Sequence, residues 1–293
     1  MGRLGSLIAT LSLSVIAQYS SAETSFNGQN ALQHIANQIA YGPRSPDNPQ
    51  GKQQTLNYIK KTLEPLTDSL VEQPFYYQKL QGINLWATVQ GTGDQATSER
   101  IMLGAHWDTR PLQGKNVNKV NLGANDGASG VAVLLELARI LSISPPAVSV
   151  DLVFFDLEDM GNINRLPFAI GSRQFVKTNA TYQPSAGIIV DMVCDKSLSI
   201  LRERHSQNRA KRLNNQIWQI AGSQQASAFK NRRGIFITDD HLPFLDAGIP
   251  VIDLIHYPFP SYWHTSQDSI DKCSASSLEQ VGRVIAEFIY SKT

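Results

Sequence analysis

The chain has 293 residues, of which 42% are hydrophobic, a composition typical of a globular protein. Its 26 Lys and Arg residues nearly balance its 25 Asp and Glu residues, so the formal net charge is +1. This charge provides no basic face for nucleic acid, and we expect no nucleic-acid partner.

The first residues have the pattern of an export signal. Arg3 precedes the apolar run Leu4–Ala17, and Ser20-Ser21-Ala22 offers the small residues that a signal peptidase recognises. A buried helix or a membrane anchor is the alternative, but the run is shorter than the roughly 20 residues of a membrane-spanning helix. We therefore expect a signal peptide over 1–22 and an exported protein, periplasmic or secreted, with no membrane contact after cleavage.

Residues 23–293 are enough for one large core, and no linker composition divides them, so we expect one domain. The apolar periods predict helices over 29–40, 51–63, 127–141, 168–177, 207–223, 241–247 and 277–291. They predict strands over 83–90, 101–105, 150–156, 186–193, 198–201 and 251–255. The alternation of the two indicates an α/β sandwich, with a central, twisted, mostly parallel mixed sheet flanked by helices.

The chain has two cysteines, Cys194 and Cys273. In an oxidising compartment they can form a disulfide, which would close a loop of roughly 80 residues and stabilise the fold by about 4 kcal/mol. Two free buried thiols also fit the sequence, because it does not give the distance between the Cα atoms.

Several predicted strands end at acidic or histidine side chains. His106 follows one buried strand, the pair Glu158 and Asp159 follows another, and Asp191 lies near the end of a third. Open α/β sheets keep their ligand sites at the carboxyl ends of strands, so we expect these side chains to meet. The glycine-rich turn 123–130, which opens a helix, can bring Asp126 to the same place.

Imidazole and carboxylate donors of this kind suit zinc. Glu158 and Asp159 are adjacent, so they cannot point the same way, and one can bind a metal while its neighbour faces the substrate as a base. Acidic pairs are more often solvated loops, and Asp-Gly turns before helices are mostly structural. The position of the pair after a buried strand favours the metal site.

Seven motifs follow one another in a fixed order: His106-Trp-Asp108, Gly123-Ala-Asn-Asp126, Phe155-Asp-Leu-Glu158-Asp159, Gly171-Ser172-Arg173, Asp191, Asp239-Asp240-His241-x-Pro-Phe244 and Trp263-His264-Thr265. This order resembles the zinc aminopeptidase clan. More narrowly, it resembles the animal-type glutaminyl-peptide cyclotransferases, the glutaminyl cyclases, which share the fold of that clan. The resemblance covers the chain from about Gly104 to the C-terminus.

The resemblance implies one zinc ion per chain, with Asp126, Asp159 and His264 as its ligands. It also implies that Glu158 is the general acid/base. One departure is visible, because the cyclases have Glu-Glu where this chain has Glu158-Asp159. The shorter ligand must bring its backbone closer to the metal by about one methylene, so we expect the loop 160–166 to be built differently.

The remaining implied site residues surround the substrate. Asp191 and Asp239 match a carboxylate pair in the catalytic hydrogen-bond network. Trp263 matches an aromatic wall of the pocket, and Phe259 matches its rim. His106 matches a ligand of the two-zinc aminopeptidases that stays off the metal in cyclases. Without the motif, Trp263 would more often be a core residue, since aromatic side chains pack cores more often than pockets.

The implied activity converts the N-terminal glutamine of peptides or proteins to pyroglutamate and releases ammonia. Zinc would polarise the side-chain amide as a Lewis acid, and the α-amine would close a five-membered ring without an external nucleophile. Peptides or proteins with N-terminal glutamine are therefore the expected partners, and we expect a monomer.

Two other functions use the same residues. A two-zinc exopeptidase of the same clan would activate a bridging water with Glu158 and bind its metals through His106, Asp126, Asp159, Asp191 and His264, all of which are present. A non-catalytic binding module should have lost a ligand or the base, and none is missing. The motifs at 239–241 and 259–264 resemble those of cyclases more than those of peptidases, so we favour the cyclase.

Overall fold

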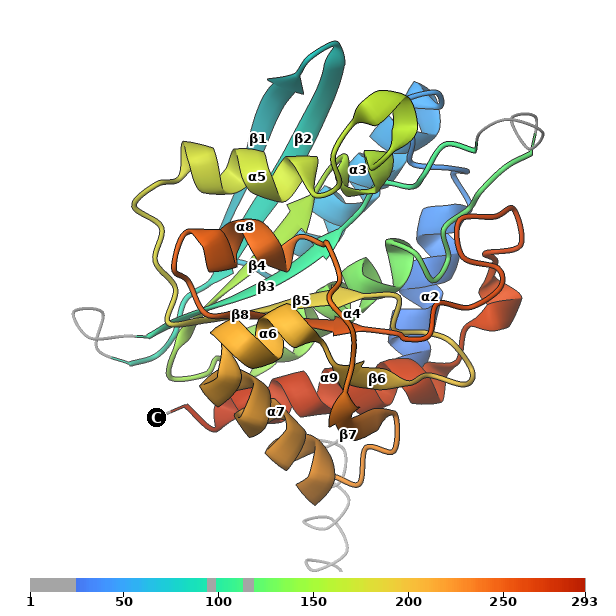
Figure 1. Ribbon diagram of the computed structural model, residues 1–293. Helices are drawn as coiled ribbons and strands as arrows, with labels where there is room; N and C mark the ends of the chain where they lie inside the picture. The colour runs from blue at the N-terminus through green and yellow to red at the C-terminus, as the bar shows by residue number, and fades with distance from the viewer. Residues whose placement is uncertain (1–24, 94–98, 113–118, 293) are drawn as a thin grey trace, which may run out of the picture.

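The computed structural model describes residues 25–93, 99–112 and 119–292. Within them a six-stranded sheet runs through the molecule, and helices cover both of its faces (Figure 1). The predicted α/β sandwich is therefore confirmed. The signal peptide predicted over 1–22, and with it export, lies outside the described residues and stays a prediction. No helix in the described part of the chain is long and apolar enough to cross a membrane.

The large sheet is mostly parallel. Its strands lie in the order β1-β2-β4-β3-β5-β8. They are β1 (Ser69–Tyr77), β2 (Leu80–Val89), β4 (Ser149–Phe155), β3 (Arg100–His106), β5 (Ala186–Asp191) and β8 (Val251–Ile255). The last four are parallel to one another, and β1 and β2 form an antiparallel hairpin at one edge. A separate parallel pair joins β6 (Ile200–Arg202) to β7 (Phe229–Arg233).

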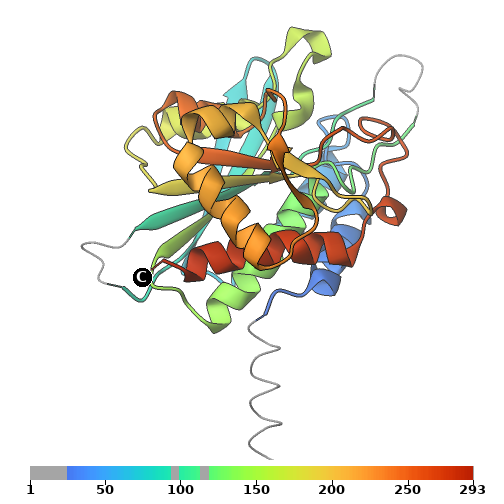
Figure 2. The same ribbon diagram turned by 60° about the horizontal axis from the view of Figure 1, so that its bottom comes forward.

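The central strands are buried on both faces, so alternate side chains enter two different cores. In β3, Ile101 and Leu103 pack into the larger core and Met102 into a smaller one. The larger core is covered by α2 (Gly28–Ile39), α4 (Ala128–Ile143) and α9 (Ala275–Tyr290), which lie together in Figure 2. The smaller core contains residues of α5 (Ile170–Thr178) and α8 (His241–Asp246) on the opposite face. The remaining α-helices are α3 (Pro49–Leu63), α6 (Arg204–Arg209) and α7 (Lys211–Ser223).

The carboxyl ends of β3, β4, β5 and β8 lie at one edge of the sheet, because these strands are parallel. From β3 the chain passes through α4 to β4 on one side, and from β4 through α5 to β5 on the other side of β3. The direction of crossing therefore reverses beside β3. Such switch points are the usual ligand sites of open α/β sheets.

Three elements differ from the sequence expectations. Strand β1 has no counterpart among the predicted strands, because it is an exposed edge strand that contains Pro74 and shows no buried face. Strand β7 has none either, since its sequence after Phe229 is polar and largely exposed. The helix predicted over 207–223 is two helices, because the backbone of Ala210, at φ −126° and ψ 39°, leaves the helical region. Alanine favours helices, so no sequence signal marks this break.

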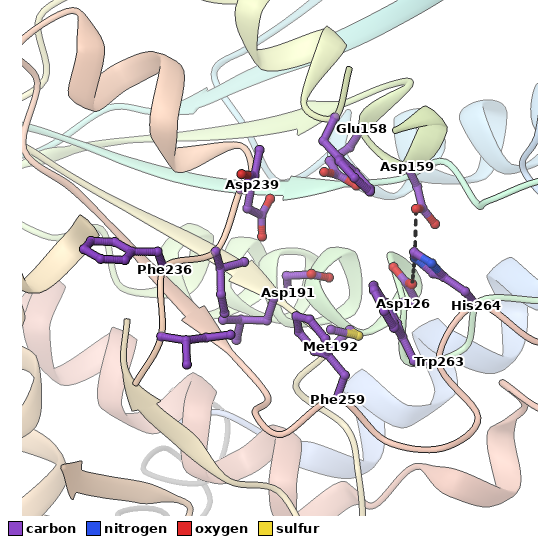
Figure 3. A pocket seen from close by; sticks show the side chains of 15 residues that line it. Asp126, Glu158, Asp159, Asp191, Met192, Phe236, Asp239, Phe259, Trp263 and His264 are labelled. Carbon is purple, nitrogen blue, oxygen red and sulfur yellow. Dashed lines mark ion pairs between the residues drawn. The ribbon is translucent and has the colours of Figure 1, made fainter. Parts of the chain in front are cut away.

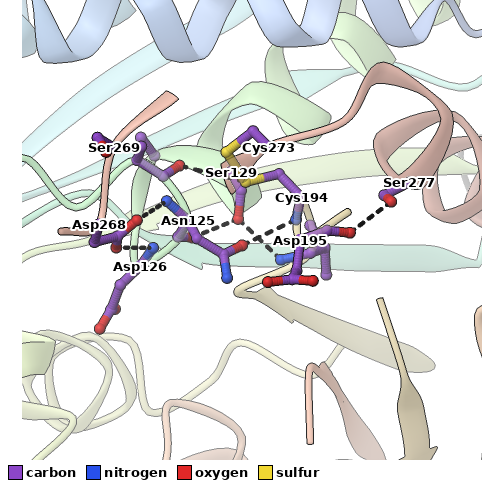
Figure 4. Close-up of a disulfide and its surroundings, with 12 residues drawn as sticks. Asn125, Asp126, Ser129, Cys194, Asp195, Asp268, Ser269, Cys273 and Ser277 are labelled. Carbon is purple, nitrogen blue, oxygen red and sulfur yellow. Dashed lines mark hydrogen bonds between the residues drawn. A yellow bond between two sulfur atoms is a disulfide. The ribbon is translucent and has the colours of Figure 1, made fainter. Parts of the chain in front are cut away.

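Cys194, which follows β5, forms a disulfide with Cys273, which precedes α9 (Figure 4). The Cα atoms are 4.6 Å apart, and the two cysteines are separated by 79 positions in the sequence. Of the two alternatives that the sequence leaves open, the structure has the bonded one. The disulfide joins the segment after Asp191 to the segment after His264.

We predict that Gly130→Ala lowers the free energy of unfolding by about 1–3 kcal/mol, because α4 lies too close to β5 for a side chain there. A Cβ atom at Gly130 would lie 2.0 Å from the carbonyl oxygen of Val190. Gly222→Ala is the matched control: a Cβ there meets nothing within 4 Å, so the change should be neutral or stabilise by up to about 1 kcal/mol. Urea denaturation measures both, and equal stabilities of the two variants would contradict the prediction.

Candidate metal centre

Asp126 lies in a turn that is held from two sides. Gly127, with φ of 91°, has a conformation that side chains rarely tolerate, and α4 begins at the next residue. The buried guanidinium of Arg44 donates to carbonyl oxygens of the turn, including that of Asp126 at 3.4 Å. From the other side, the carboxylate of Asp268 accepts from the backbone N–H groups of Asn125 and Asp126, at 2.8 and 2.9 Å (Figure 4). These contacts fix the position of the Asp126 carboxylate.

Glu158 and Asp159 follow β4 in a short 3₁₀ turn. Leu157, with φ of 60° and ψ of 28°, is left-handed and turns the chain out of the strand. The carboxylate of Asp108 accepts from the backbone N–H groups of Glu158 and Asp159, at 3.0 and 3.2 Å. Arg110 donates to the carbonyl oxygen of Asp159 at 3.1 Å. The backbone of the acidic pair is thus anchored, and its side chains are left for the site.

His264 comes from the loop after β8 and is packed by aromatic rings. Its own φ is 56°, in the left-handed region. The ring of Trp263 stacks on the imidazole, with 3.8 Å between the centroids, and Phe259 stacks on Trp263 at 4.4 Å. The stack limits rotation of the imidazole and covers one side of it with apolar surface.

Two groups of donor atoms share Asp126. In the first, Nε2 of His264 lies 3.4 Å from Oδ2 of Asp126 and 3.0 Å from Oδ1 of Asp159. In the second, Nε2 of His106 lies 3.1 Å from Oδ1 of Asp126 and 3.2 Å from Oδ1 of Asp191. In each group, one donor atom from every member lies within 4.8 Å of the others.

The first group fits a metal ion. Zinc bonds of about 2.0–2.1 Å in a tetrahedral arrangement place ligand atoms about 3.4 Å apart, close to the two separations measured from His264. Oδ2 of Asp159 is buried and has no hydrogen-bond partner in the described part of the chain. One imidazole with two carboxylates is also a donor set that zinc accepts. The structure therefore supports a metal site at Asp126, Asp159 and His264.

The buried carboxylates disturb one another's ionisation. Burial and the charge of Asp239 raise the pKa of Glu158 well above its ordinary value. Burial and the charge of Asp191 raise the pKa of Asp239 to about 6. Burial alone would lower the pKa of His264, but Asp159 and Asp126 raise it to about 9. Metal ligands must lose their protons, so a cation at this site would compete with protons for His264 and Asp159.

All eight site residues predicted from the sequence line one pocket of about 200 Å³ (Figure 3): Asp126, Glu158, Asp159, Asp191, Asp239, Phe259, Trp263 and His264. Apolar side chains, among them Met192, Ile237 and Ile255, form much of the remaining wall. The volume is below the roughly 300–1,000 Å³ of pockets for drug-sized ligands, so the pocket suits a single amino-acid side chain. His106 lies buried beside Asp126 and is not part of the lining.

The residues that hydrogen-bond to the backbone around the candidate metal ligands are absent from the predicted site residues. Arg44 lies far before the motifs at the strand ends and Asp268 lies after the last of them, and neither has a local signal. Asp108 belongs to the His106 motif, but nothing in the sequence shows that it anchors the acidic pair. Asn125 adds another link, because its side-chain oxygen accepts from the backbone N–H of Cys194 at 3.0 Å. These roles depend on contacts between distant segments, which periodicity does not show.

The chain is similar in sequence to one protein family and in structure to several solved proteins. The model of peptidase family M28 matches residues 84–289. The glutaminyl-peptide cyclotransferase of Gloydius blomhoffii is 24% identical over 282 residues, which cover 84% of this chain and 76% of that protein.

Two solved structures from Bacteroides thetaiotaomicron are each 32% identical, with TM-scores of 0.84. One is a glutaminyl cyclase bound to N-acetylhistamine, and the match covers 92% of this chain and 99% of that one. The other is a leucine aminopeptidase precursor, and the match covers 92% of this chain and 98% of that one.

We predict that Asp268→Asn weakens metal binding about 10- to 100-fold. The asparagine amide offers one acceptor where the carboxylate offers two, so one of the two backbone N–H groups loses its partner and the Asp126 turn loosens. Zinc affinity, measured by competition with a chromogenic chelator, checks this. The control is Asp271→Asn, an exposed carboxylate in the same segment. Equal affinities of the two variants would show that Asp268 does not position Asp126.

Proposed function

The chain belongs to peptidase family M28, and we propose that within this family it is a glutaminyl-peptide cyclotransferase, which converts an N-terminal glutamine to pyroglutamate and releases ammonia. One observation carries the proposal. Glu158 lies beside the Asp126, Asp159 and His264 donors in a pocket of about 200 Å³ with aromatic walls. Relatives with the name of this activity support the same assignment.

We assign Asp126, Asp159 and His264 as the residues that hold one zinc ion per chain. The chemistry that zinc supplies when bound is Lewis-acid polarisation of the glutamine side-chain amide. The contact with Arg110 is compatible with this assignment. Arg110 donates to Oδ1 of Asp159 at 3.4 Å, a long contact that leaves lone pairs on Oδ1, and Oδ2 of the same carboxylate has no hydrogen-bond partner among the described residues.

Glu158 moves the proton. The substrate's α-amino nitrogen attacks the side-chain amide carbon, so a ring C–N bond forms while the bond to the amide nitrogen breaks. Glu158 takes a proton from the α-amine and delivers it to the departing nitrogen, which leaves as ammonia. Burial and the charge of Asp239 raise the pKa of Glu158, which makes its carboxylate a stronger base toward the proton of the α-amine.

Asp191 and Asp239 orient the reacting groups. Both are buried and line the pocket, and the negative charge of Asp191 contributes to the raised pKa of Asp239. Since burial and the charge of Asp191 raise the pKa of Asp239 to about 6, both carboxylates can accept hydrogen bonds from the substrate amine above that pH, and Asp239 becomes a donor below it. Trp263 and Phe259 keep water from the reacting carbon, which favours ring closure over hydrolysis.

A two-metal exopeptidase is the second candidate, because the group of His106, Asp126 and Asp191 is also complete. The number of metal ions separates the two functions. We expect the chelator-treated protein to lose activity and to regain it fully with one equivalent of zinc per chain. Metal analysis and titration measure this. A requirement for two equivalents, together with release of free N-terminal residues from peptides, would favour the exopeptidase.

We predict that Glu158→Gln lowers kcat by at least about 10²- to 10⁴-fold, because the amide cannot transfer the proton. Ammonia release from glutaminyl peptides, with mass spectrometry of the product, gives the rate. Metal content should be unchanged, since Glu158 is not an assigned ligand. Glu287→Gln, an exposed change on α9, is the matched control. Activity of Glu158→Gln at the control level would refute this role of Glu158.

A further inference from the structure

The mouth of the pocket has an apolar rim that the reaction does not use. Ile235 and Phe236 are 40% and 49% exposed, and both line the pocket. The other large hydrophobic side chains with comparable exposure in the described residues do not line it. Figure 3 shows Phe236 at the end of the pocket away from His264, with Asp239 between them.

The rim is held firmly by α6 and the residue before it. The carbonyl oxygen of Ile235 accepts from the backbone N–H of Arg204 at 2.9 Å, and the N–H of Ile237 donates to Oε1 of Glu203 at 3.2 Å. The Phe236 ring packs against the guanidinium of Arg204, 4.3 Å from the ring centroid, and against the ring of His205, at 4.6 Å between centroids. An aromatic ring that is fixed in this way yet half exposed presents a preformed apolar surface.

In the proposed cyclase reaction, the substrate chain leaves the pocket through its mouth, where this surface lies. The glutamine side chain occupies the pocket, which has room for one side chain, and its backbone continues through the mouth to the second residue of the peptide. The rim is continuous with the pocket wall through Ile237 and Thr238. The second residue is therefore the part of the substrate that meets Phe236.

We propose that Phe236, with Ile235, is a specificity-determining contact that favours substrates with a large apolar or aromatic residue directly after the N-terminal glutamine. The contact buries apolar surface on both partners and allows the offset or edge-to-face packing that aromatic pairs prefer. The guanidinium of Arg204 lies close behind the ring, and its charge disfavours a basic second residue. The proposal rests on the proposed cyclase function.

The experiment compares kcat/KM for three peptides, Gln-Phe-Ala, Gln-Ala-Ala and Gln-Lys-Ala, with the zinc-loaded protein. We expect Gln-Phe-Ala to exceed Gln-Ala-Ala about 10-fold, mainly through KM, and Gln-Lys-Ala to be the poorest. Phe236→Ala should reduce the kcat/KM ratio of Gln-Phe-Ala to Gln-Ala-Ala to about 1–2, whereas Phe236→Leu should retain part of this preference. Tyr76→Ala, at a 73% exposed aromatic residue on β1, is the control and should keep the ratio.

The outcomes separate the two proposals. No turnover of any glutaminyl peptide contradicts the cyclase function itself. Turnover with equal kcat/KM for the phenylalanine and alanine peptides, or a ratio that survives Phe236→Ala, overturns the specificity contact alone. Sedimentation velocity of the same variants tests whether the rim binds a second copy of the chain instead. If Phe236→Ala changes self-association but not the kcat/KM ratio of the phenylalanine and alanine peptides, the rim is such an interface and the proposal is wrong.

Discussion

Repulsion between buried carboxylates is the constraint on which the structure around the site depends. Asp126, Glu158, Asp159, Asp191 and Asp239 all reach one small pocket at the carboxyl edge of the sheet. Such a concentration of negative charge is costly inside a protein unless positive groups or hydrogen-bond donors balance it. The chain supplies two imidazoles and two arginines there. A divalent cation would supply the remaining positive charge.

The same constraint explains the backbone around the site. Leu157, Met192 and His264 each have positive φ, and each is a site residue or the immediate neighbour of one. Non-glycine residues adopt this conformation uncommonly and at an energetic cost, although several turn residues outside the pocket, among them Asn162 and Gln225, also have it. At Leu157 the enforcement comes from Asp108, which holds the next two N–H groups. Strained backbone conformations beside the site thus accompany the convergence of short acidic side chains from different strands.

The parts of this arrangement that have a local signal are predictable from the sequence. Buried strands show as continuous apolar runs, so β3, β4, β5 and β8 can be located, and the polar residues after them identify the edge of the sheet that carries the pocket. The resemblance to cyclases then selects the eight residues that the structure brings together. The edge strand β1 and the break at Ala210 are not predictable in this way, because neither leaves a periodic pattern.

The supporting contacts are hidden for a different reason. Arg44 reaches the Asp126 turn from 82 positions away, and Asp268 reaches it from 142 positions away. A buried arginine or aspartate looks like any surface charge in a linear sequence, and only the folded chain shows which polar groups it satisfies. The departure from the cyclases at Asp159 is visible in the sequence, but the 3₁₀ turn and the contact with Arg110 that hold this residue are seen only in the folded chain.

The disulfide has a topological consequence for the pocket. Everything between Cys194 and Cys273, including Asp239, Phe236 and His264, is part of one covalent ring closed by the two sulfur atoms. A protease that cuts a single exposed bond within this ring opens it but releases no fragment. Much of the pocket wall therefore remains tethered to the sheet after nicking, in contrast to a chain held by noncovalent contacts alone.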